Sequence, residues 1–170
     1  MIEQVNAAII KHHQHGLLLD ANLMLVLVIG TLRPEYVGTV PRTKAFVRDD
    51  YYLLLSLCRR FLAVVTTPHV LTEVGNLLDN TGLMNNQASV SIVRDTLRQF
   101  REKFVVSREA MNQPTFYSCG LTDSVLYYLT HRHYLLLTTD AVLCNFVLSR
   151  GCDAINFNNI RTYAWQDWQA

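Results

Sequence analysis

The sequence predicts an α/β fold in which a mainly parallel sheet lies between two layers of helices. Short runs made only of apolar residues are typical of strands buried on both faces, and the chain contains several. They alternate with segments of helical apolar spacing, which favours strand–helix–strand units and a parallel sheet. Half of the 170 residues are hydrophobic and 17% are charged, which is enough apolar material for one core. A three-layer α/β/α sandwich is therefore expected.

The elements expected before residue 104 follow this alternation. The run 17–19 indicates a buried strand, and Asp20 closes it. Thr67 and Pro68 indicate a helix start, since threonine is a common N-cap and proline suits the first helical position. The series comprises a strand over 16–20, a helix over 22–29 that begins with Asn22 as the capping-type residue, a loop with Pro34 and Pro41 over 32–42, a helix over 43–61, a strand over 63–66, a helix from Thr67 to about 80, and a helix over 86–103.

The second half continues the pattern after a less regular stretch. The sequence predicts a strand over 104–106, an irregular connection with Pro114 over 107–118, a helix over 122–132, a strand over 134–138, a helix over 140–150 and a strand over 154–157. One domain is expected over 1–157, with its core over 16–157, insertions at about 31–61 and 104–120, and a C-terminal tail over 158–170.

Composition narrows the class of protein. The formal net charge of +1 indicates neither a strongly basic nor a strongly acidic partner. The longest apolar run, 23–29, is far shorter than the roughly 20 residues of a membrane span, so no membrane association is expected. No secretion signal is expected from residues 1–11, and the four cysteines lack CxxC spacing. Reduced thiols and a cytoplasmic location are therefore expected.

Two groups of histidines resemble metal-binding tracts. They are the run over 12–15, with three histidines, and the pair His131 and His133. Zinc sites usually add cysteine or a fixed helical spacing, and neither is evident here. Both groups are interpreted as surface or loop residues.

Four acidic residues follow strands or begin helices. Asp20 and Asp140 each close an apolar strand, whereas Glu73 and Asp123 lie near the starts of helices. In a parallel sheet the carboxyl ends of strands and the starts of the following helices share one edge, where ligands bind. The four carboxylates are therefore expected to converge.

Such a cluster needs compensation, because each close pair of carboxylates repels by about 1–4 kcal/mol in a partly solvated setting. Mg²⁺ and Mn²⁺ prefer oxygen ligands and suit an all-carboxylate site. Metal-assisted hydrolysis of a phosphate substrate is the chemistry that follows. Taken singly, an acid such as Asp123 at a helix start also has a structural explanation, because it caps the helix and complements its dipole.

The ordered set of motifs resembles the PIN domain family of metal-dependent ribonucleases. The resemblance spans about residues 16–157 and depends on the order of the four acids, since each motif alone is weak. The carrying segments are Leu17-Leu18-Leu19-Asp20-Ala21-Asn22-Leu23, Thr67-Pro68-His69-Val70-Leu71-Thr72-Glu73-Val74, Leu121-Thr122-Asp123-Ser124 and Leu137-Thr138-Thr139-Asp140.

The resemblance implies roles by position. Asp20, Glu73, Asp123 and Asp140 would be the catalytic residues and would hold Mg²⁺ or Mn²⁺, with Asn22 and Thr139 as polar support. The implied activity is endoribonucleolytic cleavage of RNA that leaves a 3′-hydroxyl and a 5′-phosphate. Small members are often toxins of toxin–antitoxin pairs, so an antitoxin partner and a homodimer are expected. The chain departs from compact members in its two insertions, and the one over 104–120 is expected to form a hairpin or flap over the site.

The charge balance agrees with an RNA substrate. With the four site acids set aside, 10 acidic residues remain against 15 basic ones. Arg33, Arg42, Lys44 and Arg48 are the first candidates for phosphate contacts. A second basic group, Arg94, Arg98, Arg101 and Lys103, is expected along one helix.

Two alternatives stay open. A haloacid-dehalogenase-like phosphohydrolase would need an acid two residues after its nucleophilic aspartate, but that position holds Asn22. A catalytically silent module of the same fold, serving in RNA binding or scaffolding, would be expected to lose acids. All four are present here.

Overall fold

A computed structural model of the chain describes residues 2–167. The five strands it shows there are β1 (Leu17–Leu19), β2 (Val64–Thr66), β3 (Arg101–Glu102), β4 (Leu135–Thr138) and β5 (Ala154–Asn156). The α-helices are α1 (Ile2–His12), α2 (Ala21–Leu32), α3 (Arg48–Cys58), α4 (Pro68–Asp79), α5 (Gln87–Leu97), α6 (Ser107–Met111), α7 (Phe116–Thr130), α8 (Ala141–Ser149) and α9 (Phe157–Asp167). Two short 3₁₀ helices, η1 (Pro34–Tyr36) and η2 (Pro41–Thr43), precede α3.

The strands form one parallel sheet in the order β3-β2-β1-β4-β5. Leu18 of β1 is in register with Val65 of β2 and with Leu136 of β4. The chain moves outward from β1 to β3 on one side and then returns to place β4 on the other side of β1. The order of strands therefore reverses between β1 and β4, which is where ligands bind in open α/β sheets.

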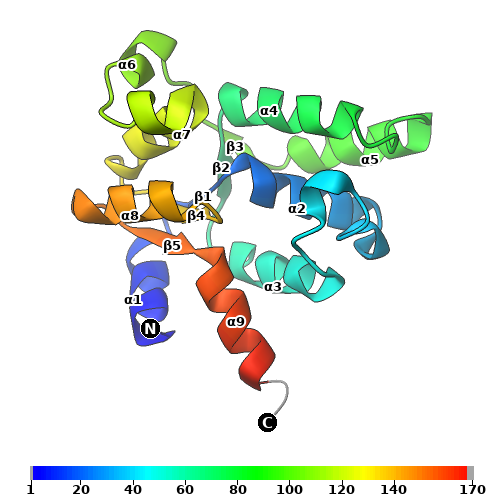
Figure 1. The fold of residues 1–170 in the computed structure, drawn as a ribbon, viewed down its shortest axis with the longest axis horizontal. Helices are drawn as coiled ribbons and strands as arrows, with labels where there is room; N and C mark the ends of the chain where they lie inside the picture. The colour runs from blue at the N-terminus through cyan, green and yellow to red at the C-terminus, as the bar shows by residue number, and fades with distance from the viewer. Residues whose placement is uncertain (1, 168–170) are drawn as a thin grey trace.

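Helices cover both faces of this sheet, as the predicted α/β/α sandwich requires. Figure 1 shows α1, α3 and α9 on one side, and α4, α6 and α7 on the other. Ile9, Leu57 and Ile160 from the first group line a small apolar space against the sheet. The predicted fold class is confirmed.

The helix after β1 is the most buried helix of the structure. Residues 23–30 of α2 are all buried, and α2 packs against α3, α4 and α5. Its apolar surface on all sides is what a helix surrounded by other helices requires. The cap of this helix is Asp20, because its carboxylate accepts from the backbone N–H of Leu23. Asn22 was expected as the capping residue, but the cap lies two residues earlier and the helix begins at Ala21.

Several predicted boundaries also differ from the structure. Helix α3 begins at Arg48, since Pro41 and the buried Thr43 hold the preceding segment in η2. Helix α5 ends at Leu97, and the third strand is Arg101–Glu102 and not 104–106. The connection over 107–118 contains α6 and the start of α7, so it is helical and forms no hairpin. Both ends of the described chain, α1 and most of the predicted tail, are helical; residues 168–170 lie outside the described residues.

Two further observations concern the cysteines and the apolar helices. Cys58, Cys119, Cys144 and Cys152 are all free thiols. No helix within residues 2–167 is long and apolar enough to cross a membrane.

Candidate active site

Asp20 is fixed at the reversal point of the sheet by hydrogen bonds from two directions. Its Oδ1 accepts from the N–H of Leu23 at 2.7 Å, which caps α2. Its Oδ2 accepts from the hydroxyl of Thr138 at 2.6 Å and from the N–H of Thr139 at 2.8 Å. The side chain is only 5% exposed, and burial raises the pKa of its carboxyl group despite these hydrogen bonds. The end of β4 thus holds the acid that closes β1.

Thr138 is a site residue that sequence reasoning missed. It is the last residue of β4 and is fully buried. Its hydroxyl donates to Asp20 and accepts from the backbone N–H of Asp140 at 2.9 Å. Thr139, which was expected as polar support, also directs its hydroxyl to Asp20 at 3.4 Å. The signal available in the sequence was a threonine that ends the apolar run Leu135–Leu137, two residues before the expected site acid Asp140.

Asp140 stands on the other side of the reversal point. It caps α8, because its Oδ1 accepts from the N–H groups of Val142 at 2.7 Å and Leu143 at 3.0 Å. The residue is exposed, so its carboxylate borders solvent at the edge of the sheet. Asp20 and Asp140 therefore have the structural capping role that the sequence left open, and they also lie where the topology places ligands.

Asp123 reaches the same edge because α7 is kinked. Gly120 has φ 82° and ψ −172°, a combination essentially restricted to glycine, and it divides α7 in two. The second half begins after Gly120 and carries Asp123 in its first turn. Ser124 stabilises this break, since its hydroxyl donates to the carbonyl of Gly120 at 2.7 Å and accepts from the hydroxyl of Thr115 at 3.0 Å.

The charges of three other acids act on Asp123. Burial raises the pKa of Asp123, and the charges of Asp140, Asp20 and Glu73 raise it further, to about 7. Each of these three acids comes from a different element, yet all act on the same side chain. Glu73, Asp20 and Asp140 therefore lie close enough to Asp123 for their charges to act on its carboxyl group.

The cluster is open and does not enclose an ion by protein ligands alone. Among residues 2–167, no three histidine, cysteine, aspartate or glutamate side chains approach closely enough to form a metal cage. The donors are all carboxylates, however, which are the hard oxygen ligands that Mg²⁺ and Mn²⁺ prefer. Mg²⁺ commonly binds through one or two carboxylates and completes its shell with water and substrate phosphate, so an open cluster fits this class of ion.

Glu73 connects the cluster to an open groove of about 540 Å³. Glu73 is exposed on α4, as are its neighbours Thr72 and Asn76. The opposite wall comes from the segment before α6 and from α7. The lining residues are Pro68, His69, Thr72, Glu73, Asn76, Phe104, Ser107, Leu121 and Thr122.

The first group of expected substrate contacts lies around the far end of α2 and the start of α3. Arg33 follows α2, about 18 Å from Asp20 for a 12-residue helix, and stacks on Tyr36 at 5.7 Å. Arg48 pairs with Asp49 at 3.6 Å. Arg42, in η2, and Lys44 are exposed. Asn22, the other polar support residue, is exposed in the first turn of α2.

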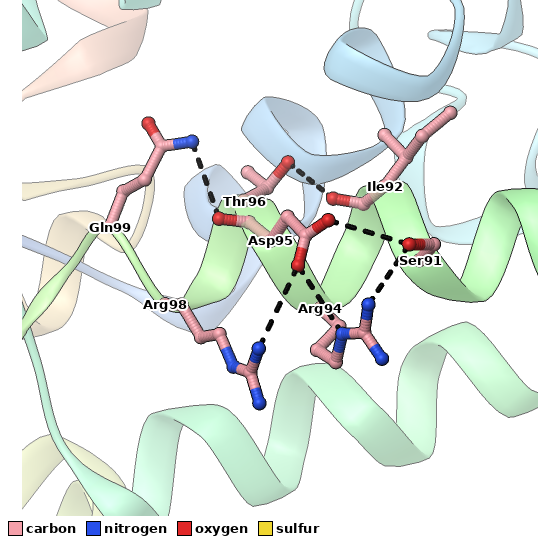
Figure 2. Close-up of polar contacts among 7 residues, drawn as sticks. All are labelled: Ser91, Ile92, Arg94, Asp95, Thr96, Arg98 and Gln99. Carbon is pink, nitrogen blue, oxygen red and sulfur yellow. Dashed lines mark hydrogen bonds and ion pairs between the residues drawn. The ribbon is translucent and has the colours of Figure 1, made fainter.

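The second basic group is divided between two elements, so its prediction as one helix was wrong. Arg94 and Arg98 lie on and just after α5, whereas Arg101 is in β3. Figure 2 shows that Asp95 forms ion pairs with both arginines. Its Oδ1 lies 3.3 Å from Arg94 Nε and 3.9 Å from Arg98 Nη1. These exposed ion pairs partly neutralise the basic surface of α5.

His12 was expected at the surface but is buried. Its Nδ1 lies 2.6 Å from the carbonyl oxygen of His133, and its Nε2 lies 2.7 Å from Asp153 Oδ2. Each ring nitrogen thus faces an oxygen atom of another element. Burial alone would raise the pKa of Asp153, but hydrogen bonds from Lys11 and His12 outweigh it and lower that pKa. This contact ties α1 to the loops before β4 and β5, and it is structural.

Comparison of the chain with protein-family models, with curated protein sequences and with solved structures finds no match to any of them.

Proposed function

We propose that this chain is a Mg²⁺- or Mn²⁺-dependent endoribonuclease of the PIN type that acts in the cytoplasm. The observation that supports the proposal is that Thr138 bonds to both Asp20 and Asp140 where the strand order reverses, and that the charges of Asp20, Glu73 and Asp140 raise the pKa of Asp123. Asp20, Glu73, Asp123 and Asp140 occur in the same order as the acids of the PIN family.

The cluster is costly to the protein unless it has a cationic partner. Helix capping accounts for Asp20 and Asp140, but it does not account for Glu73 or for the half-buried Asp123 beside three like charges. A bound Mg²⁺ or Mn²⁺ would offset this repulsion and supply Lewis acidity at a phosphate group. Asp20 is oriented for such a role, since hydrogen bonds from Leu23, Thr138 and Thr139 fix both of its oxygens.

RNA is the proposed substrate because of the resemblance and because the carboxylates adjoin an open groove. A closed pocket would favour a small phosphate ester as the substrate. A groove that continues past Glu73 has room for a single strand of RNA. The toxin of a toxin–antitoxin pair is the proposed biological setting, with an antitoxin and a second copy of this chain as partners. These parts of the proposal follow from the resemblance.

Cleavage of a single-stranded RNA by Glu73→Gln and by the wild-type chain tests the activity. Glu73 is the best acid to replace, because it is exposed and caps no helix, whereas Asp20 and Asp140 each cap one. We expect wild-type cleavage to require Mg²⁺ or Mn²⁺, to stop in EDTA, and to fall at least about 100-fold in Glu73→Gln, the scale of losing one catalytic electrostatic contact.

The matched control is Asp79→Asn, which removes an exposed acid at the other end of the same helix. It should cleave like the wild type. Cleavage that persists at full rate in Glu73→Gln would exclude the carboxylate cluster as the centre. RNA binding without cleavage under either metal would favour the silent binding module over the nuclease.

A further inference from the structure

The groove next to Glu73 contains features that the hydrolytic reaction does not need. Phe104 lines it and is 78% exposed, a large cost for an aromatic ring that has no role in the core. Polar side chains of Asn76, Ser107 and Thr122 line the same groove. An exposed ring beside hydrogen-bonding groups is the usual composition of a surface that receives a nucleobase.

The walls of this groove are held together. His69, in the first turn of α4, contacts the hydroxyl of Ser107 at 3.3 Å through its Nε2. Just before Phe104, the backbone N–H of Lys103 donates to the carbonyl of Thr66 at 2.8 Å, which anchors the segment to the end of β2. Phe104 therefore projects from a fixed backbone, and the groove is already formed without a ligand.

Two cationic side chains lie near Phe104 in the chain, beside the exposed acids Glu102 and Glu109. Lys103 precedes the ring, and Arg108 is exposed on α6, one residue after Ser107. Single-strand binding sites combine such cations with aromatic rings on which successive bases stack. Glu73 lines the groove and its charge acts on Asp123, so an RNA strand with one phosphate near Asp123 would extend into the groove.

We propose that this groove is a nucleotide subsite, in which Phe104 stacks on one base of a single-stranded RNA adjacent to the scissile phosphate. The inference rests on the proposed function and extends it, because it assigns a substrate contact to the segment between β3 and α6. Asn76 and Thr122 would contact the edge of that base. Selection for an unpaired nucleotide follows, since a base in a duplex has no free face for the ring.

The test measures RNA affinity and not cleavage. A fluorescent 12-nucleotide oligoadenylate is titrated with Asp123→Asn protein in Mg²⁺, and its anisotropy gives Kd. In this background the added Phe104→Leu should weaken binding about 10-fold, the scale of losing one stacked base. Phe104→Trp should bind at least as well as Phe104. Because the ring is exposed, neither change should affect folding.

Abasic scanning makes the test specific to stacking. Removing the one base that rests on Phe104 should weaken binding by a similar factor, and Phe104→Leu should then add little, because both changes remove the same contact. Tyr52→Leu is the matched control, since Tyr52 is 47% exposed on α3, on the other side of the sheet. It should leave Kd unchanged.

The outcomes separate this inference from the proposed function. If the wild type cleaves RNA but Phe104→Leu binds as tightly as Phe104, the subsite is wrong and the nuclease stands. If neither the wild type nor the Asp123→Asn protein binds RNA, both proposals fail. A third outcome would also overturn the subsite. If Phe104→Leu weakens binding by the same factor for the intact RNA and for every abasic RNA, the ring makes a contact other than stacking on one base.

Discussion

Thr138 joins two aspartates that close neighbouring segments, through a single hydroxyl group. The hydroxyl donates to Asp20 at 2.6 Å and accepts from the N–H of Asp140 at 2.9 Å. In Thr138→Val both partners lose this bond while the side-chain volume is retained. We expect the free energy of unfolding to fall by about 1–3 kcal/mol. Metal-dependent RNA cleavage should also fall, because both acids lose a positioning contact. Urea unfolding and a cleavage assay measure the two effects.

The matched variant is Thr138→Ser, which keeps the hydroxyl and should retain most of the cleavage activity. A valine variant that loses stability but cleaves at the wild-type rate would show that the bridge supports the fold alone.

Asp123 has a raised pKa that a nearby cation would lower. Its pKa is raised to about 7, so its ionised form is disfavoured in the folded protein. Asp123→Asn should therefore increase the stability of the metal-free protein at pH 8, by about 2–4 kcal/mol for a shift of this size. Adding Mg²⁺ should stabilise the wild type by about 1–3 kcal/mol at concentrations well above its Kd. The variant should gain less.

Thermal unfolding in EDTA and in Mg²⁺ tests both halves of this prediction, with Asp79→Asn as the exposed control. Equal stabilisation of wild type and Asp123→Asn by Mg²⁺ would place the cation elsewhere.

At the scale of elements, the kink in α7 decides where Asp123 lies. Gly120 adopts φ 82° and ψ −172°, and a Cβ added there would meet no atom within 4 Å. Gly120→Ala therefore tests the backbone conformation alone. We expect a loss of about 1–3 kcal/mol in the free energy of unfolding, and weaker cleavage as the start of the second half of α7 shifts.

Gly75→Ala provides the opposite control. Gly75 lies in α4, near Glu73, and an added Cβ there also meets nothing within 4 Å. An alanine in a helix interior should stabilise by about 0.5–1 kcal/mol. Chemical denaturation of both variants checks the contrast, and a neutral Gly120→Ala would mean that the kink is not needed.

The predictability of the elements follows from burial. Strands β1, β2, β4 and β5 were predicted to within about two residues at each end, because strands buried on both faces consist of apolar runs such as Leu135–Leu137. Strand β3 was misplaced, since it has two exposed residues at the sheet edge and no apolar pattern. Helix α6 was missed because five residues with Pro114 nearby carry no helical period.

The candidate site was predictable to the extent that topology fixes it. The rule that carboxyl ends share one edge brought Asp20, Asp123 and Asp140 together without any side-chain detail. The rule contains no information on which buried hydroxyl supports them, so Thr138 was missed. The rule also gives no information on His12, because the partners of its ring, Asp153 and the carbonyl of His133, are distant in the sequence.

At the scale of the whole molecule, two kinds of acid give opposite pH dependences. The pKa of Asp153 is lowered, so its contribution to stability is present above the unfolded value of 3.8 and is lost as the pH falls through the folded value. The pKa values of Asp20, Asp50 and Asp123 are raised. Their contributions are complete below 3.8 and are lost as the pH rises, for Asp123 through about 7.

The metal-free protein should therefore be most stable on the acid side of neutrality, between about pH 4 and 6, and should lose stability toward pH 8. Thermal unfolding in EDTA from pH 3.5 to 8.5 measures this profile. Asp123→Asn should flatten the alkaline side only, and Asp153→Asn should flatten the acid side only. Mg²⁺ should restore stability near pH 8, because a cation favours the ionised carboxylates and offsets their repulsion. A profile with its maximum above pH 7 in EDTA would contradict the repulsion among the four acids on which the proposed metal centre depends.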